Sequence, residues 1–238
     1  MLSDLNNDFI AQGKFLFPPS DALLMNALLS NLSRTLTLLA LFAIISVTMP
    51  PAMAHNPIFG QDNHDLSTAV RIPDANISYA MYGYLDAPGE AQFYYMDISS
   101  PVSLMTQMNV PKNDVYANFR PSYAIIGPGI TTHDPIPFEV PAGNGSLLIN
   151  ASRQEPRSEF YEPFSGITYN NSAKTYTDIT VPGRYYIAIF DGSHKKGDYF
   201  LATGELESFS IWDLPSVIWK VIQLRLGWLD HSKEAAST

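Results

Sequence analysis

One histidine in this chain is placed to bind a metal, because it follows a candidate export-signal cleavage site. His55 comes directly after Ala52-Met53-Ala54, the small-x-small pattern that signal peptidase recognises. Cleavage there gives His55 a free α-amine, and an amine and an imidazole on one residue form a bidentate chelate. Nitrogen-rich sites of this kind suit Cu(II). The chain is therefore expected either to bind copper or to have no cofactor.

A copper site at His55 needs a further ligand from elsewhere in the chain. His64 lies nine residues on, and His133 and His194 lie in predicted loops. Pro57 has no amide proton, so the backbone nitrogen of the third residue cannot coordinate the metal. Two alternatives stay open: His55 and one of these histidines hold copper, or His55 is an exposed residue without a role.

The N-terminal part has the features of an export signal. Leu36–Met49 is an apolar run preceded by Arg34, and it is shorter than the roughly 20 residues of a membrane span. Residues 1–54 are therefore predicted to be a leader with a cleaved signal helix, with an uncleaved anchor as the alternative. Met25 is a candidate for the true start, because residues 1–24 carry three aspartates and one lysine.

Composition excludes several classes of function. The net charge is −9, which repels the phosphate backbone of nucleic acids, so no nucleic-acid partner is expected. The chain has no cysteine, which excludes disulfides, thiolate metal sites and a cysteine nucleophile. Its 13 Tyr and 13 Phe are residue types that favour strands.

Short apolar runs bounded by Pro, Gly, Asn and Asp predict an all-β domain. An antiparallel β-sandwich of jelly-roll type is expected over residues 77–207, because two sheets bury many short strands around one core. An N-terminal segment at 55–76 precedes it, and a C-terminal helix at 211–229 and a tail at 230–238 follow it. The nine predicted strands are 77–84, 91–98, 102–109, 122–126, 136–140, 146–150, 175–181, 184–191 and 198–206.

Three short motifs resemble the pre-peptidase C-terminal domain, a small secreted β-sandwich. They are Gln92–Asp97, Pro182–Ile187 and Gly197–Leu201. The resemblance extends from the strand ending at Ile98 to Gly204, and it implies an accessory role in binding or secretion without chemistry. The last two motifs also predict a hairpin that turns at residues 191–197.

The predicted N-terminal histidine also resembles that of the copper histidine-brace proteins, which include lytic polysaccharide monooxygenases and periplasmic copper carriers. In those families a second imidazole completes the site around copper. The resemblance covers His55 and the sandwich class alone. It implies a periplasmic copper protein, either a carrier or a redox enzyme.

Common catalytic motifs are absent from the sequence: no nucleophile elbow, zinc-protease helix or phosphate-binding glycine loop occurs. Glu155, Glu159 and Glu162 offer paired carboxylates of the kind that cleave glycosides, although spacing alone does not show their geometry. They fall in residues 154–169, predicted to be a long loop or short helix whose aromatic residues cover the core or form a contact surface. An enzyme is therefore not the favoured interpretation.

All three tryptophans lie near the C-terminus, on a predicted apolar helix. Trp212, Trp219 and Trp228, with the basic Lys220 and Arg225, fit a helix that lies in a membrane interface or in the groove of a partner protein. Packing on the chain's own sandwich is the alternative. The sequence thus favours an exported, periplasmic or extracellular, non-enzymatic envelope protein that acts by binding, with the copper protein as alternative.

Overall fold

The computed structural model describes residues 28–37, 55–150, 155–162, 165–208, 214–227 and 230–236. The chain divides into two compact units, Met1–Ala52 and Met53–Thr238. In the first, residues 28–37 form a helix. Most of the predicted signal helix and the whole cleavage site lie outside the described residues. None of the helices in the described part of the chain has the length and apolar character to cross a membrane.

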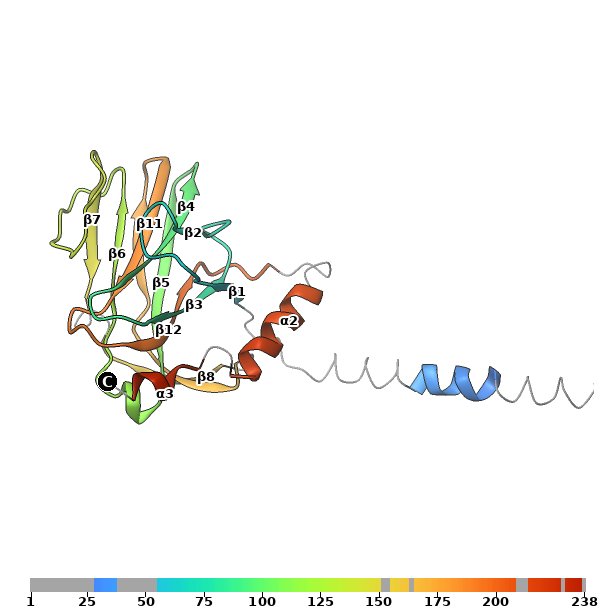
Figure 1. The fold of residues 1–238 in the computed structure, drawn as a ribbon. Coiled ribbons are helices and arrows are strands. Elements are labelled where there is room, and N and C mark those ends of the chain that lie inside the picture. The colour runs from blue at the N-terminus through green and yellow to red at the C-terminus, as the bar shows by residue number, and fades with distance from the viewer. Residues whose placement is uncertain are drawn as a thin grey trace, which may run out of the picture. The chain divides into compact units, whose positions relative to one another are not determined.

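The second unit is built from two sheets (Figure 1). The seven-stranded sheet has the order β1-β3-β12-β5-β9-β8, and β10 also pairs with β5. Its strands are β1 (Asn56–Phe59), β3 (Tyr79–Leu85), β5 (Val102–Pro111), β8 (Ser158–Glu162), β9 (Ile167–Asn171), β10 (Thr175–Ile179) and β12 (Gly197–Thr203). The five-stranded sheet has the order β2-β4-β11-β6-β7. Its strands are β2 (Val70–Arg71), β4 (Ala91–Ile98), β6 (Ser122–Gly127), β7 (Gly145–Ile149) and β11 (Gly183–Phe190).

Three short helical elements accompany the sheets. The 3₁₀ helix η1 (Asp114–Tyr116) follows β5, and Asn113 caps it by accepting a hydrogen bond from the Val115 amide. Helix α2 (Leu214–Arg225) and helix α3 (Ser232–Ala235) follow the last strand. α2 lies within the range 211–229 that was predicted to be a C-terminal helix.

Eight of the nine predicted strands coincide with observed ones, and residues 136–140 do not form a strand. That segment is a loop whose apolar residues cover the outer face of the five-stranded sheet. The Phe138 ring packs edge-on against Phe93 at 5.1 Å and against Phe190 at 5.6 Å. The apolar residues of this loop alternate along the chain and pack on a sheet without pairing as a strand. Periodicity alone cannot distinguish such a loop from a strand.

The expectation of a purely antiparallel sandwich is wrong at two edges. β1 pairs with β3, and β2 pairs with β4, in parallel. Both added strands belong to the N-terminal segment 55–76, which therefore extends one edge of each sheet. Strand direction depends on where the connecting chain crosses over, and side-chain alternation carries no information about it.

The predicted hairpin that turns at residues 191–197 is also wrong, because β11 and β12 lie in different sheets. The connection crosses from one sheet to the other, and Asp191 fixes its start by accepting hydrogen bonds from the Ser193 and Arg120 amides. The expected loop or helix at 154–169 includes β8 and the start of β9, two antiparallel strands. A hydrogen bond from the Gly166 amide to the Glu162 carbonyl, 2.9 Å, closes their turn.

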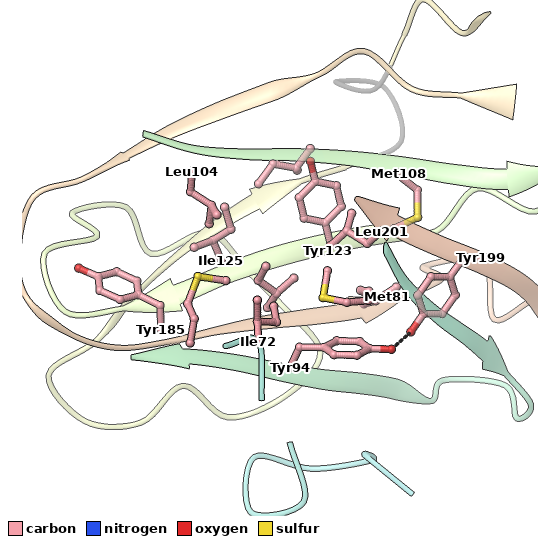
Figure 2. Packing of buried hydrophobic residues seen from close by; sticks show 14 of the residues in the cluster. Ile72, Met81, Tyr94, Leu104, Met108, Tyr123, Ile125, Tyr185, Tyr199 and Leu201 are labelled. Atoms are coloured by element: carbon pink, nitrogen blue, oxygen red, sulfur yellow. Dashed lines mark hydrogen bonds between the residues drawn. The ribbon is translucent and has the colours of Figure 1, made fainter. Parts of the chain in front are cut away.

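The main core fills the space between the two sheets (Figure 2). Its largest fully buried side chains include Tyr94, Tyr123, Tyr185 and Tyr199. A second cluster lies on the other face of the seven-stranded sheet. It consists of Ala80, Tyr82, Tyr169, Phe200 and Ala202, with Phe59 and Ile167 packed against it. The β8–β9 pair is therefore attached to the sandwich by aromatic packing as well as by pairing with β5.

Candidate functional site

A cleft of about 510 Å³ adjoins this second cluster. Its walls come from chain segments far apart in sequence: the N-terminal segment after β1, strands β3, β4, β9 and β12, the end of β5 with η1, and the tail at 230–231. This volume is in the range of small-molecule sites, which favour a concave surface with a few convergent polar groups.

The floor of the cleft is a chain of hydrogen bonds between buried side chains. Tyr199 donates from its hydroxyl to Gln92 Oε1 at 2.6 Å, and the hydroxyls of Tyr199 and Tyr94 are 3.3 Å apart. Gln92 Nε2 donates to the Tyr84 carbonyl at 2.6 Å. Burial raises the pKa of Tyr94 to about 12, so this phenol stays neutral at physiological pH.

One wall is organised around Asp198. This carboxylate accepts a hydrogen bond of 2.5 Å from the Tyr116 hydroxyl at Oδ2 and one of 2.9 Å from the His231 amide at the same oxygen. His231 Nδ1 lies 2.7 Å from Oδ1. The His231 ring also stacks on Tyr84, with centroids 4.2 Å apart and planes 11° apart. Asp198 and Tyr84 are directly opposed in the β12–β3 register, so one strand pair presents both contacts.

The rim of the cleft is acidic. Asp62, Asp86 and Asp230 line it and are exposed. The ammonium group of Lys112 lies 2.6 Å from Glu159, which offsets its charge. His64 lies at the rim with Nδ1 2.9 Å from Glu90 Oε1, and burial raises the pKa of this glutamate.

The predicted metal ligands are placed apart. His55 is half-buried in a separate cleft of about 310 Å³, and its Nδ1 is 2.5 Å from the Ser78 hydroxyl. His133 is exposed, and its Nδ1 lies 3.3 Å from the Thr131 carbonyl. His194 lies in the β11–β12 connection with φ of 57°, next to the β3–β4 turn. His64, His133 and His194 do not line the cleft that contains His55.

The described residues do not bring His64, His133 or His194 into the cleft of His55. An amine and an imidazole of one residue chelate through Nδ1, the nitrogen that faces Ser78 here. Within the part of the chain that the structure describes, no three His, Asp or Glu side chains gather closely enough to hold a metal ion. Copper binding at His55 stays a prediction from the cleavage site alone.

The three glutamates that offered candidate carboxylate pairs each have a different partner. Glu162 is buried and accepts a hydrogen bond from the Ser165 amide at 2.5 Å. Glu159 pairs with Lys112, and Glu155 lies 3.4 Å from Arg157 Nε. Glu159 and Glu162 both belong to β8, where Glu159 is exposed and Glu162 is buried.

Of the residues of the C-terminal helix predicted to contact a membrane or a partner, Lys220 and Arg225 contact the sandwich, whereas Trp219 is exposed to solvent. Lys220 donates from Nζ to the Pro57 carbonyl at 2.8 Å, and the Arg225 guanidinium lies against Gly166. Both basic residues therefore contact the sandwich side, through β1 and the β8–β9 turn. Trp219 is 54% exposed. Trp212 and Trp228 lie outside the described residues.

The cleft residues Tyr84, Tyr116, Asp198 and His231 were not predicted as site residues. Asp198 begins a predicted strand and His231 belongs to a predicted tail, so neither stands near the other in sequence. A lone carboxylate beside a strand start carries no signal, because solvated turn carboxylates have the same pattern. Two features of the tertiary structure bring these groups together. The β12–β3 register places Asp198 opposite Tyr84, and the tail after α2 folds back so that His231 contacts Asp198.

Asp198→Asn is expected to lower the pKa of His231. The hydrogen bond to Asp198 raises the pKa of His231 above its usual value, so the folded state favours the charged imidazole. This contribution to stability is fully present below about pH 6.5 and is lost as pH rises through the raised pKa. NMR titration of the imidazole protons should show a higher midpoint for His231 in the wild type than in the variant. Equal midpoints for His231 in both proteins would refute the pairing.

The fold and the cleft define this chain as a two-sheet β-sandwich protein with an acidic, tyrosine-lined cleft. Among solved structures, it matches the pre-peptidase C-terminal domain of a collagenase from Bacillus anthracis at 13% sequence identity and a TM-score of 0.31. The match covers 57% of this chain and 93% of that domain. No family model and no curated protein matches the sequence. The pairing of the strands, and not this likeness, therefore defines the fold.

Proposed function

We propose that this chain is an exported, non-enzymatic envelope protein that acts by binding and associates with a membrane surface through residues 212–229. The structural scaffold in this proposal is a β-sandwich of jelly-roll type. Strand pairing supports it: the sheets contain the orders β3-β12-β5-β10 and β4-β11-β6-β7. With β8 and β9 set aside, successive strands in these orders fall in different sheets except for the adjacent pair β6 and β7. β8 and β9 are an insertion into that pattern, and β1 and β2 are additions at its edges.

One observation carries the membrane proposal, namely an exposed apolar surface on α2. Ile218, Trp219 and Ile222, with Leu226 in the following turn, are 54%, 54%, 40% and 61% exposed. At 100° per residue these positions fall within one arc of the helix. Lys220 lies on the opposite side of the helix and donates to the Pro57 carbonyl of β1. Arg225, seven residues after Ile218, lies at the edge of the arc and reaches Gly166 in the β8–β9 turn.

A lipid surface fits this arc better than full insertion does. The helix has 12 residues, which is about 18 Å at 1.5 Å per residue and shorter than the roughly 30 Å hydrocarbon core. An amphipathic helix instead lies in the interface plane, with tryptophan at the level of the headgroups. The net charge of −9 disfavours anionic lipids, so zwitterionic lipid is the expected surface.

Trp219→Ser is expected to weaken vesicle binding about tenfold, because transfer of a large apolar side chain into the interface contributes about 1.5–3 kcal/mol. The measurement is flotation of the full chain with phosphatidylcholine vesicles. Tyr176→Ser is the matched control, since Tyr176 is 53% exposed on β10, outside α2. The proposal fails if the wild type does not float, or if both variants lose binding equally.

A further inference from the structure

We propose that the 510 Å³ cleft binds a small organic cation with a planar charged group, and that His231 occupies the position of that group in the absence of the ligand. The ligand class is a guanidinium or imidazolium compound. The proposal is independent of the function proposed for α2, because α2 contributes no residue to the lining of the cleft.

The charge of the lining selects a cation. Four carboxylates face the cleft, from Asp62, Asp86, Asp198 and Asp230. Lys112 is paired with Glu159, so its charge does not balance them. A concave surface lined by one sign of charge raises the local concentration of ions of the opposite sign. Anionic ligands are repelled by the same carboxylates.

The position of His231 indicates the shape of the charged group. Its ring lies nearly parallel to that of Tyr84 while Nδ1 faces Asp198, so an aromatic face and a carboxylate contact the same planar group. Asp198 is 7% exposed, which strengthens its interaction with a cation in contact with it. Arginine-like groups combine stacking on aromatic rings with hydrogen bonds to carboxylates, whereas a tetrahedral ammonium group does not stack.

The tail at residues 230–236 can detach from the cleft when a ligand binds there. Its contacts with the sandwich include those of His231 and the packing of the half-buried Ala235 against the main core. α3 has only four residues and none of them is buried. Few buried apolar contacts permit local opening at low free energy. A ligand that takes the place of the imidazole keeps Asp198 paired while the tail detaches.

Competition with His231 makes binding depend on pH. The groups that face this imidazole are Asp198 on β12, Tyr84 on β3, Tyr116 on η1, and Asp230 and Glu234 in the tail. Hydrogen bonding to Asp198 raises the pKa of His231, so the competing imidazole is charged at pH 6 and loses its charge as the pH rises through the raised pKa. A guanidinium ligand keeps its charge over this range. Its affinity is therefore expected to rise with pH.

The test is isothermal titration of the full chain with agmatine, a small guanidinium compound. We expect one-to-one binding, about threefold tighter at pH 8 than at pH 6, and tighter in His231→Ala than in the wild type at pH 6. Asp198→Asn is expected to weaken binding tenfold or more, because a hydrogen bond to a charged group is lost. Sucrose and phosphate are the neutral and anionic comparison ligands, and neither is expected to bind.

Because Asp198 is buried, Asp198→Asn could lose binding through misfolding. Two further variants, at exposed carboxylates, therefore test the contribution of charge to binding. Asp62 and Asp86 are exposed, so the double variant Asp62→Asn/Asp86→Asn should fold normally and bind agmatine several-fold more weakly. Asp178→Asn is the matched control, because Asp178 is an exposed carboxylate on β10 outside the cleft lining. Absent binding, equal binding of sucrose, or an affinity unaffected by His231→Ala would overturn the proposal.

Discussion

Phe200→Ala is expected to lower the free energy of unfolding by about 3–5 kcal/mol, the usual cost of removing a buried aromatic ring. Phe200 is 1% exposed on β12. Its ring packs edge-on against Tyr169 with centroids 4.6 Å apart, and lies 5.3 Å from Tyr82. Removal of the Phe200 ring should also loosen β9, because Tyr169 is the buried side chain that joins β9 to this cluster. Urea denaturation gives the stability, and hydrogen exchange of β8 and β9 gives the local effect.

Phe160→Ala is the matched control for this substitution. Phe160 is half-buried on β8 opposite Tyr169, and the substitution removes the same atoms from a residue that is not a member of the buried cluster. The cost should therefore be less than about half that at Phe200. Equal costs at the two positions would show that the cluster on this face of the sheet does not hold the β8–β9 pair in place.

Gly83→Ala is expected to destabilise the protein by about 2–4 kcal/mol through overpacking at the cleft floor. A Cβ at this position would lie 2.4 Å from both Gln92 Oε1 and the Tyr199 hydroxyl oxygen. Those two atoms are hydrogen-bonded to each other, so the substitution both crowds the site and breaks the bond. The main readout is the denaturation midpoint.

A double-mutant cycle with Tyr199→Phe tests this cause. Removal of the hydroxyl relieves part of the clash, so Gly83→Ala should cost less in the Tyr199→Phe protein than in the wild type. Gly192→Ala is the control, because a Cβ there meets no atom within 4 Å. Additive effects of the two substitutions would exclude a direct clash between Gly83 and Tyr199.

Strand positions were predictable where turn residues bound a short apolar run. The predicted range 91–98 coincides with β4, and 122–126 lies within β6. The errors arose where the same side-chain pattern serves more than one arrangement. The segment 136–140 alternates like a strand yet packs as a loop. Residues 154–169, predicted to be a long loop or short helix, include β8 and the start of β9.

By itself, the sequence determined the class of fold, the acidic charge and the absence of cysteine chemistry, because composition and local periodicity express these directly. It also indicated an apolar C-terminal helix. The tertiary structure decided which groups meet. His55 faces Ser78 instead of a second histidine, and Lys220 contacts β1. Asp198 and His231 meet across 33 residues of chain, through strand register and the return of the tail. Contacts between distant segments depend on the path of the whole backbone, which no local pattern encodes.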